Sequence, residues 1–177
     1  VVGTWNIDPV HTDVSFTVRH MMVSKVRGRF ETFAGQFVTA EDPTQSSVTA
    51  TVDLTSINTN NVDRDNHIRS ADFFEVESHP QMTFRSTGVR AHGNDWLLDG
   101  ALTLHGITRP ITFELEVNGF AKDPMGGTRV GFSASSEINR KDFDINTNIP
   151  MDGGGVVIGE KVQIHLEVEA VLEQPSA

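Results

Sequence analysis

The sequence contains no cysteine among its 177 residues. This absence excludes a disulfide framework, a thiolate nucleophile and a zinc site with cysteine ligands, and it leaves the redox compartment open. Basic residues are also few, since 14 Lys and Arg stand against 24 Asp and Glu, a formal net charge of −10. A chain this acidic is a poor partner for nucleic acid or for a generally anionic surface, although a local basic patch is compatible with it.

Hydrophobic runs are short as well, and none approaches the roughly 20 residues that a membrane-spanning helix needs. No basic segment followed by an apolar one marks a signal peptide at the start of the sequence. We therefore expect a cytoplasmic protein. Because the sequence begins at Val1 rather than at Met, a periplasmic or secreted location is the alternative, if a signal peptide was removed before Val1.

Most of the sequence alternates apolar and polar residues with a period of two, which is typical of half-buried strands. The clearest cases are residues 162–170 and 111–117, and residues 48–54 and 14–20 follow the same pattern. About eight such strands, mostly antiparallel neighbours, fit one domain, 1–177. Because closing the sheet removes its edges, the sequence predicts an all-β antiparallel barrel, with room inside for side chains or one slender ligand.

Residues 62–80 break the alternation and predict a short helical insertion at about 61–74. Asn60 or Asn61 can cap the helix, with Asp65 near its positive end. Phe73 and Phe74 follow directly, so two large rings would act as a plug or a lid.

Two further segments are irregular. Phe30, Phe33 and Phe37 do not keep to one face of a period of two, which predicts a bulge or corner near residues 32–35. Residues 139–155 are expected to form a long polar loop that ends in three glycines. These glycines lack the Lys-Ser/Thr that follows in a phosphate-binding loop.

A series of motifs runs through the chain in a fixed order. They begin with Trp-Asn-Ile-Asp-Pro-Val-His at 5–11 and Val-Ser-Phe-Thr-Val-Arg-His at 14–20, and the others stand at 28–35, 56–59, 64–74, 80–84, 100–106, 138–143 and 162–170. In this order, and over essentially the whole chain, they closely resemble the YceI-like family of polyisoprenoid-binding proteins. One position departs from the family pattern, because Asp144 stands where the family commonly has Gly.

The resemblance implies an extended, lipocalin-like antiparallel β-barrel with a helical insertion, which holds one long apolar molecule in its bore. Ligands of the family are isoprenoid chains, such as prenyl diphosphates or quinone-like tails, and fatty amides in some members. Family membership alone does not select one of these ligands for this chain.

Large apolar side chains on the expected strands are candidates for the lining of the bore: Phe16, Val18, Phe84, Leu102, Phe113, Phe132, Ile164 and Leu166. Further candidates for contact with the ligand are His20, Met21, Met22, Phe73, Phe74 and Phe143. The alternative is that these side chains fill a solid core, and the family resemblance favours a cavity. Each buried methylene yields about 0.8 kcal/mol, so apolar contact alone is enough to hold a chain.

Four basic residues gather within eleven positions of this acidic chain: Arg19, Lys25, Arg27 and Arg29. We expect Arg19, Arg27 and Arg29, together with Arg140, to meet a diphosphate head group or an anionic membrane surface at the mouth of the barrel. The alternative is a solvated outward strand face that Glu31 neutralises.

No metal site is expected among the seven histidines. His11, His20 and Asp13 lack the spacing of an HExxH or a Cys/His motif. His67 stands among charged residues and suggests an acid–base cluster, but an internally paired helix is the favoured interpretation. Asp65 and Arg69 are four residues apart, and Asp72 is also within reach of Arg69.

These features favour a carrier or storage protein that shields an isoprenoid-type lipid from water, with no catalytic residues and no cofactor besides such a bound ligand. An enzyme that presents the lipid head to His20, His67 or Arg140 is the alternative, and a scavenger of apolar drugs or quinones in a stress response is a third. The expected partner is an apolar small-molecule lipid and not nucleic acid. Transient membrane contact and a homodimer stay open.

Overall fold

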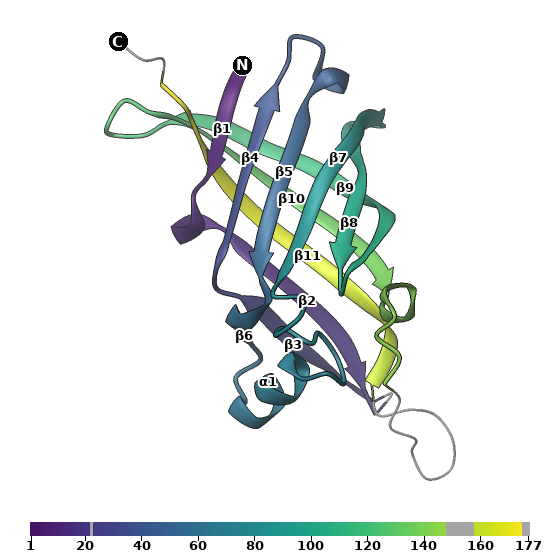
Figure 1. Cartoon of the computed structure of the whole chain (residues 1–177). Coiled ribbons are helices and arrows are strands. Elements are labelled where there is room, and N and C mark those ends of the chain that lie inside the picture. The colour runs from purple at the N-terminus through teal and green to yellow at the C-terminus, as the bar shows by residue number, and fades with distance from the viewer. Residues whose placement is uncertain (22, 148–157, 175–177) are drawn as a thin grey trace.

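The computed structural model of the chain describes residues 1–21, 23–147 and 158–174. Eight strands form a closed antiparallel barrel, in which the pairing of the first with the last completes the ring (Figure 1). In ring order they are β1 (Gly3–Ile7), β4 (Phe33–Thr39), β5 (Ser47–Asp53), β7 (Gln81–His92), β8 (Asp95–Leu104), β9 (Ile107–Lys122), β10 (Thr128–Asn139) and β11 (Ile158–Leu172). The all-β antiparallel barrel predicted from the alternation is confirmed.

Three further strands, β2 (Asp13–His20), β3 (Ser24–Phe30) and β6 (Ile57–Asn58), extend the sheet beyond the ring. β11 belongs both to the ring and to this extension, because pairs with β2 lie within residues 158–167 and pairs with β1 within residues 170–172. The chain turns from β1 into β2 through the short 3-10 helix η1 (Pro9–His11). In the described residues the sheet therefore has eleven strands, of which eight close the barrel, the number expected from the sequence.

The corner expected near residues 32–35 is a break between two strands and not a bulge. β3 ends at Phe30 and β4 begins at Phe33, and the amides of Glu31 and Thr32 both donate to Oγ of Ser56. β4 then pairs with β5 without a shift in register. Because the break separates Phe30 from Phe33, the rings on its two sides follow two independent periods.

The chain bends at three more 3-10 helices: η2 (Pro43–Gln45), η3 (Leu54–Ser56) and η4 (Arg140–Phe143). Each follows an Asp or Asn whose side chain accepts from the amide two residues later, namely Asp42, Asp53 and Asn139. Such side-chain bonds compete with the sheet ladder and end the strand. The expected loop at 139–155 thus begins with η4, while its glycines at 153–155 lie outside the described residues.

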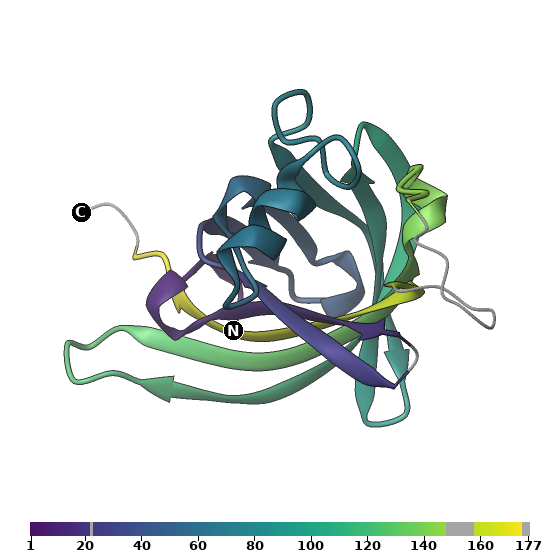
Figure 2. The same ribbon diagram turned by 90° about the horizontal axis from the view of Figure 1, so that it is seen from below.

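The insertion contains one helix, α1 (Val62–Arg69), which is seen in front of the lower end of the barrel in Figure 2. Asn61 caps it by accepting from the amide of Arg64, whereas Asn60 has a positive φ of 63°. No helix in the described part of the chain is long and apolar enough to cross a membrane.

Polar contacts anchor this helix. Asp65 is buried and accepts from the backbone amide (2.9 Å) and the hydroxyl of Thr59. Arg69 donates to the carbonyl oxygens of Thr55 and Ile57. The expected pairing of Arg69 with Asp65 or Asp72 is therefore wrong. Asp65 bonds to Thr59 instead, and Asp72 lies 2.8 Å from His67.

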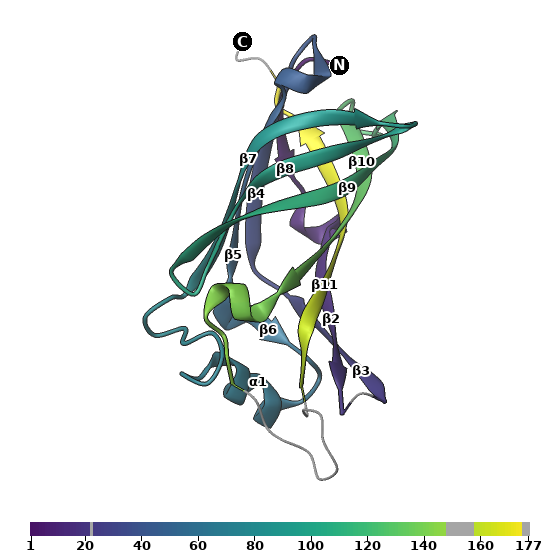
Figure 3. The ribbon, with the colours of Figure 1, turned by 90° about the vertical axis from the view of Figure 1, so that its right-hand side faces the viewer.

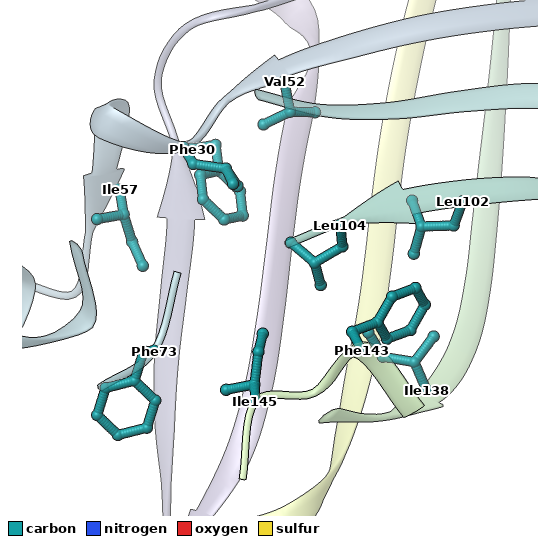
Figure 4. Close-up of a cluster of buried hydrophobic side chains, with 10 residues drawn as sticks. Phe30, Val52, Ile57, Phe73, Leu102, Leu104, Ile138, Phe143 and Ile145 are labelled. Atoms are coloured by element: carbon teal, nitrogen blue, oxygen red, sulfur yellow. The ribbon is translucent and has the colours of Figure 1, made fainter. Parts of the chain in front are cut away.

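Buried side chains fill the lower part of the barrel, beside α1 (Figure 4). This lower cluster draws on β3, β5, η3, β6, the insertion, β8, β10 and the segment around η4, with the members Phe30, Val52, Leu54, Ile57, Phe73, Leu102, Leu104, Ile138, Phe143 and Ile145. Val52 and Leu102 also line the cavity described below. Asp144 has a φ of 57°, a left-handed conformation that Gly adopts more readily, at the position where the family commonly has Gly. This conformation lets the residues on both sides of Asp144 enter the core.

An ion network stands where the ring closes. Arg129 of β10 donates to Asp8 (2.9 Å), Asp123 (3.0 Å) and Glu169 (2.7 Å). Nδ1 of His11 also lies 2.8 Å from Asp8. The hydrogen bonds from His11 and then from Arg129 lower the pKa of Asp8 from 3.8 to about 2.

Asp8 makes the stability of the closed ring depend on pH. A carboxyl whose pKa is lowered by folding contributes stability above its unfolded-state pKa, here 3.8, and loses that contribution as the pH falls toward 2. Asp8→Asn should lower the melting temperature at neutral pH and flatten the decline on acidification. Thermal unfolding across the acid range measures both effects, with Asp95→Asn at the exposed start of β8 as the control. A wild-type acid slope in Asp8→Asn would contradict this role.

Asp65 should matter more for stability than its exposed neighbour on the same helix. Asp65→Ala leaves the buried amide of Thr59 without its acceptor, which should cost about 1–3 kcal/mol of unfolding free energy. Asp63→Ala, on the exposed side of the first turn, is the matched control and should cost about 0.5 kcal/mol or less. Urea denaturation of both variants tests the difference, and equal losses would argue against anchoring by Asp65.

Candidate ligand-binding cavity

A cavity of about 260 Å³ lies above the lower cluster, toward the end of the barrel that carries both termini. All eight strands of the ring contribute to its wall, from Trp5 on β1 to Val168 on β11. Among the described residues that line it none is charged, and the polar ones carry a hydroxyl: Thr12, Thr39, Ser46, Ser47 and Thr83. The cavity is therefore suited to an apolar occupant.

The wall opens near the upper ends of β5 and β7. Their ladder stops at Thr49 and Arg85, and β7 then continues with β8 alone, after a register shift between Ser86 and Gly88. Figure 3 shows the upper ends of β7 and β8 turning away from β4 and β5. The lining at this end includes the exposed Pro43 and the half-exposed Phe120, so the cavity reaches the surface here.

Six of the residues expected in the bore line this cavity: Phe84, Leu102, Phe113, Phe132, Ile164 and Leu166. The Phe84 and Phe113 rings meet edge to face, with centroids 5.4 Å apart. Phe84 lies close against β8 because Gly100 has no side chain, and a Cβ atom there would come within 2.3 Å of the ring. A glycine on the neighbouring strand thus sets how far this ring enters the cavity.

The other apolar candidates are absent from the lining. Phe16 packs against Phe30 of the lower cluster, with ring centroids 5.6 Å apart, and Phe74 also contacts Phe30. Phe73 and Phe143 are buried members of that cluster. The two rings after the helix therefore act as a plug of the lower end and not as a lid over the opening.

Three of the remaining candidates belong to β2 and the turn after it. Val18 and His20 are half-buried on β2, and Met21 is exposed in the turn that leads to β3, so none of these three lines the cavity. Met22 lies outside the described residues. Val18, His20 and Met21 are thus at the lower end, away from the cavity lining.

The basic candidates also lie away from the cavity. Arg19, Arg27 and Arg29 are exposed on β2 and β3, and Arg29 pairs with Glu31 at 3.3 Å. They therefore do not stand at the opening, where the sequence interpretation had put them. They lie instead on an outward strand face, which was the alternative considered from the sequence.

Arg140 holds the chain in place. Its guanidinium donates to the carbonyl oxygens of Ile145 (2.7 Å), Gly159 (2.9 Å) and Ile158 (3.3 Å), and burial lowers its pKa. These bonds tie η4 to the start of β11, so Arg140 has a structural task at a distance from the lining.

Part of the cavity wall was not predicted from the sequence. Val48 and Ala50 lie on the inward face of β5, and Trp5, Trp96 and Leu98 complete the wall near the opening. The alternation at 48–54 was the available signal for the first two. It showed which face of the strand is inward, but not that this part of the interior is left hollow.

The closed antiparallel ring and its apolar cavity define a lipocalin-like barrel. More narrowly, the chain belongs to the YceI-like family, because the family model of the YceI-like domain matches residues 5–170. The chain is 42% identical to protein YceI of Escherichia coli O17:K52:H18 over 140 residues, which is 78% of this chain and 73% of that protein.

Two solved structures share the fold. The crystal structure of BcnA from Burkholderia cenocepacia is similar with a TM-score of 0.81 and 22% identity, over 92% of this chain and 98% of that one. A polyisoprenoid binding domain from Saccharophagus degradans is similar with a TM-score of 0.72 and 16% identity, over 98% of this chain and 100% of that one. At these identities, the likeness establishes the architecture of the barrel.

Proposed function

We propose that the protein binds one slender apolar molecule of isoprenoid type in the cavity and carries or stores it without changing it. The observation that carries this proposal is the lining, which in the described part of the chain contains hydroxyl groups but no charged residue. A wall of this kind offers water few hydrogen bonds and offers an apolar chain contact on all sides. The similar domain from Saccharophagus degradans is named for polyisoprenoid binding, which supports the same class of ligand.

The size of the cavity favours a thin chain. Its volume of about 260 Å³ lies just below the usual range for small-molecule pockets, about 300–1,000 Å³. Burial of ten carbons of a chain would contribute about 8 kcal/mol before the costs of ordering are subtracted. A net contribution of this size would correspond to micromolar affinity, so ten carbons bind more weakly than that once these costs are subtracted, and a longer buried chain binds more tightly.

The lining also supports binding without turnover. An enzyme that acts on a lipid head group needs a titratable group within reach of that head. His20, His67 and Arg140 were the candidates, and none of them lines the cavity. His67 instead pairs with Asp72 on the exposed side of α1.

Filling the cavity tests the proposal directly. Ala50→Leu adds three carbons to the inward face of β5 and should weaken binding of farnesol about tenfold or more. The matched control is Ala101→Leu on β8, which adds the same volume to a residue that does not line the cavity. Native mass spectrometry and isothermal titration measure bound farnesol in both variants, after melting curves have shown that both are folded. Equal affinities in the two variants would place the ligand elsewhere and overturn the proposal.

The basic residues at the lower end should be dispensable for this binding. Because Arg27 and Arg29 do not line the cavity, the double variant Arg27→Ala/Arg29→Ala should bind farnesol with unchanged affinity. Titration of farnesyl diphosphate at low and high salt extends the test to an anionic head group. If the double variant binds the diphosphate more weakly than the wild type, and high salt weakens binding by the wild type in the same way, these arginines contact the head group after all.

A further inference from the structure

Three side chains with metal-binding atoms meet at the lower end of the barrel, away from the cavity. They are Glu75 and His79, in the segment after α1, and His105, in the turn between β8 and β9. One ligand atom from each lies within 4.8 Å of those of the other two. None of the three lines the apolar cavity. This Glu75–His79–His105 cluster is therefore a separate feature of the barrel.

Local geometry brings the three residues together. The amide of His79 donates to the carbonyl oxygen of Glu75 (2.9 Å), which closes one helical turn and places both side chains on the same side. His105 and Gly106 both have positive φ, 56° and 74°, as a tight two-residue hairpin turn requires. The His79 ring lies directly against Gly106, where a Cβ atom would come within 2.9 Å of it.

Hydrogen bonding fixes which nitrogen of His105 can bind a cation. Nδ1 lies 2.9 Å from the carbonyl oxygen of Phe143, and a carbonyl can only accept, so Nδ1 carries the hydrogen. In the neutral ring, Nε2 then presents a lone pair. This atom is buried and has no hydrogen-bond partner in the part of the chain that the structure describes. A buried acceptor with no donor is costly.

A carboxylate, which is also an acceptor, lies near this lone pair. Nε2 of His105 lies 3.5 Å from the carboxylate of Glu75, and the His79 ring meets the His105 ring edge to face, with centroids 5.1 Å apart. Tetrahedral coordination at about 2.1 Å from a metal ion separates ligand atoms by about 3.4 Å. The observed spacing of the nitrogen and the carboxylate thus matches that of two ligands of one ion.

From this cluster we propose a binding site for a divalent transition metal ion of the zinc class, with Glu75, His79 and His105 as protein ligands and solvent completing the coordination. Two imidazoles and one carboxylate are a donor set that suits Zn²⁺. The bond from His105 to the carbonyl of Phe143 acts as the outer contact that orients the ligand. The ion fastens the segment after α1 to the β8–β9 turn. This site departs from the sequence expectation, which included no metal.

A second cluster of similar composition shows the contrast. Asp8, His11 and Glu169 also have ligand atoms within 4.8 Å of one another. There the guanidinium of Arg129 already lies between the two carboxylates, at 2.9 Å from Asp8 and 2.7 Å from Glu169. That cluster is satisfied by an internal cation, and it provides a control for the proposed site.

Metal titration of the full chain without an affinity tag tests the proposal. Wild-type protein should bind one Zn²⁺ per chain in competition with a chromophoric chelator, and Co²⁺ at the same site should show the visible absorption of tetrahedral coordination. Glu75→Gln, His79→Gln and His105→Asn should each weaken Zn²⁺ binding about tenfold or more. Zn²⁺ should raise the melting temperature of the wild type and not that of these variants.

His11→Gln, in the contrasting cluster, is the matched control and should bind Zn²⁺ like the wild type. Glu75→Gln and His79→Gln keep the bond from His105 to Phe143, so they stay informative where His105→Asn fails to fold. Three results would overturn the site: no stoichiometric Zn²⁺ binding by the wild type, binding unchanged in Glu75→Gln and His79→Gln, or an equal loss in His11→Gln.

Discussion

Closure of the ring between β1 and β11 is the constraint on which the rest of the structure depends. Only three residue pairs form this ladder: Trp5 with Leu172, Asn6 with Val171 and Ile7 with Ala170. A ladder this short needs support, and the surrounding side chains supply it. Trp5 and Ala170 are completely buried, and the Arg129 network joins η1, β10 and β11 next to the seam. Without the seam, β1 and β11 would present free edges, and the cavity would lose part of its wall.

Segments outside the ring strands explain why the barrel is filled at one end and hollow at the other. At the lower end, the insertion and η4 bring Phe73 and Phe143 into the bore from outside the strands. At the upper end the described lining comes mainly from the ring strands themselves, and small residues such as Ala50 and Ala134 stand among its aromatic rings. The phenyl rings after the helix thus help to fill one end of the barrel.

The sequence predicted the parts of the fold that depend on local periodicity. The alternation at 162–170 corresponds to β11, and the break at 62–80 contains α1. The sequence did not show where β3 ends and β4 begins, because that corner depends on hydrogen bonds to Oγ of Ser56, which is remote in the sequence. The same limit applies to the bore. Phe84 and Phe16 look alike in the sequence, and both pack against the lower cluster, yet Phe84 also lines the cavity and Phe16, on the β2–β3 extension, does not.

The Glu75–His79–His105 cluster shows why a site assembled from two segments is difficult to find in a sequence. The spacing of four between Glu75 and His79 was its only local signal, and that spacing is common on ordinary helices. The third member comes from a hairpin turn about thirty residues away, and only the docking of the insertion against that turn joins them. This docking also explains why polar groups are tolerated beside the plug. The carbonyl of Phe143 holds one nitrogen of His105, so the same residue that fills the core also orients the imidazole at its edge.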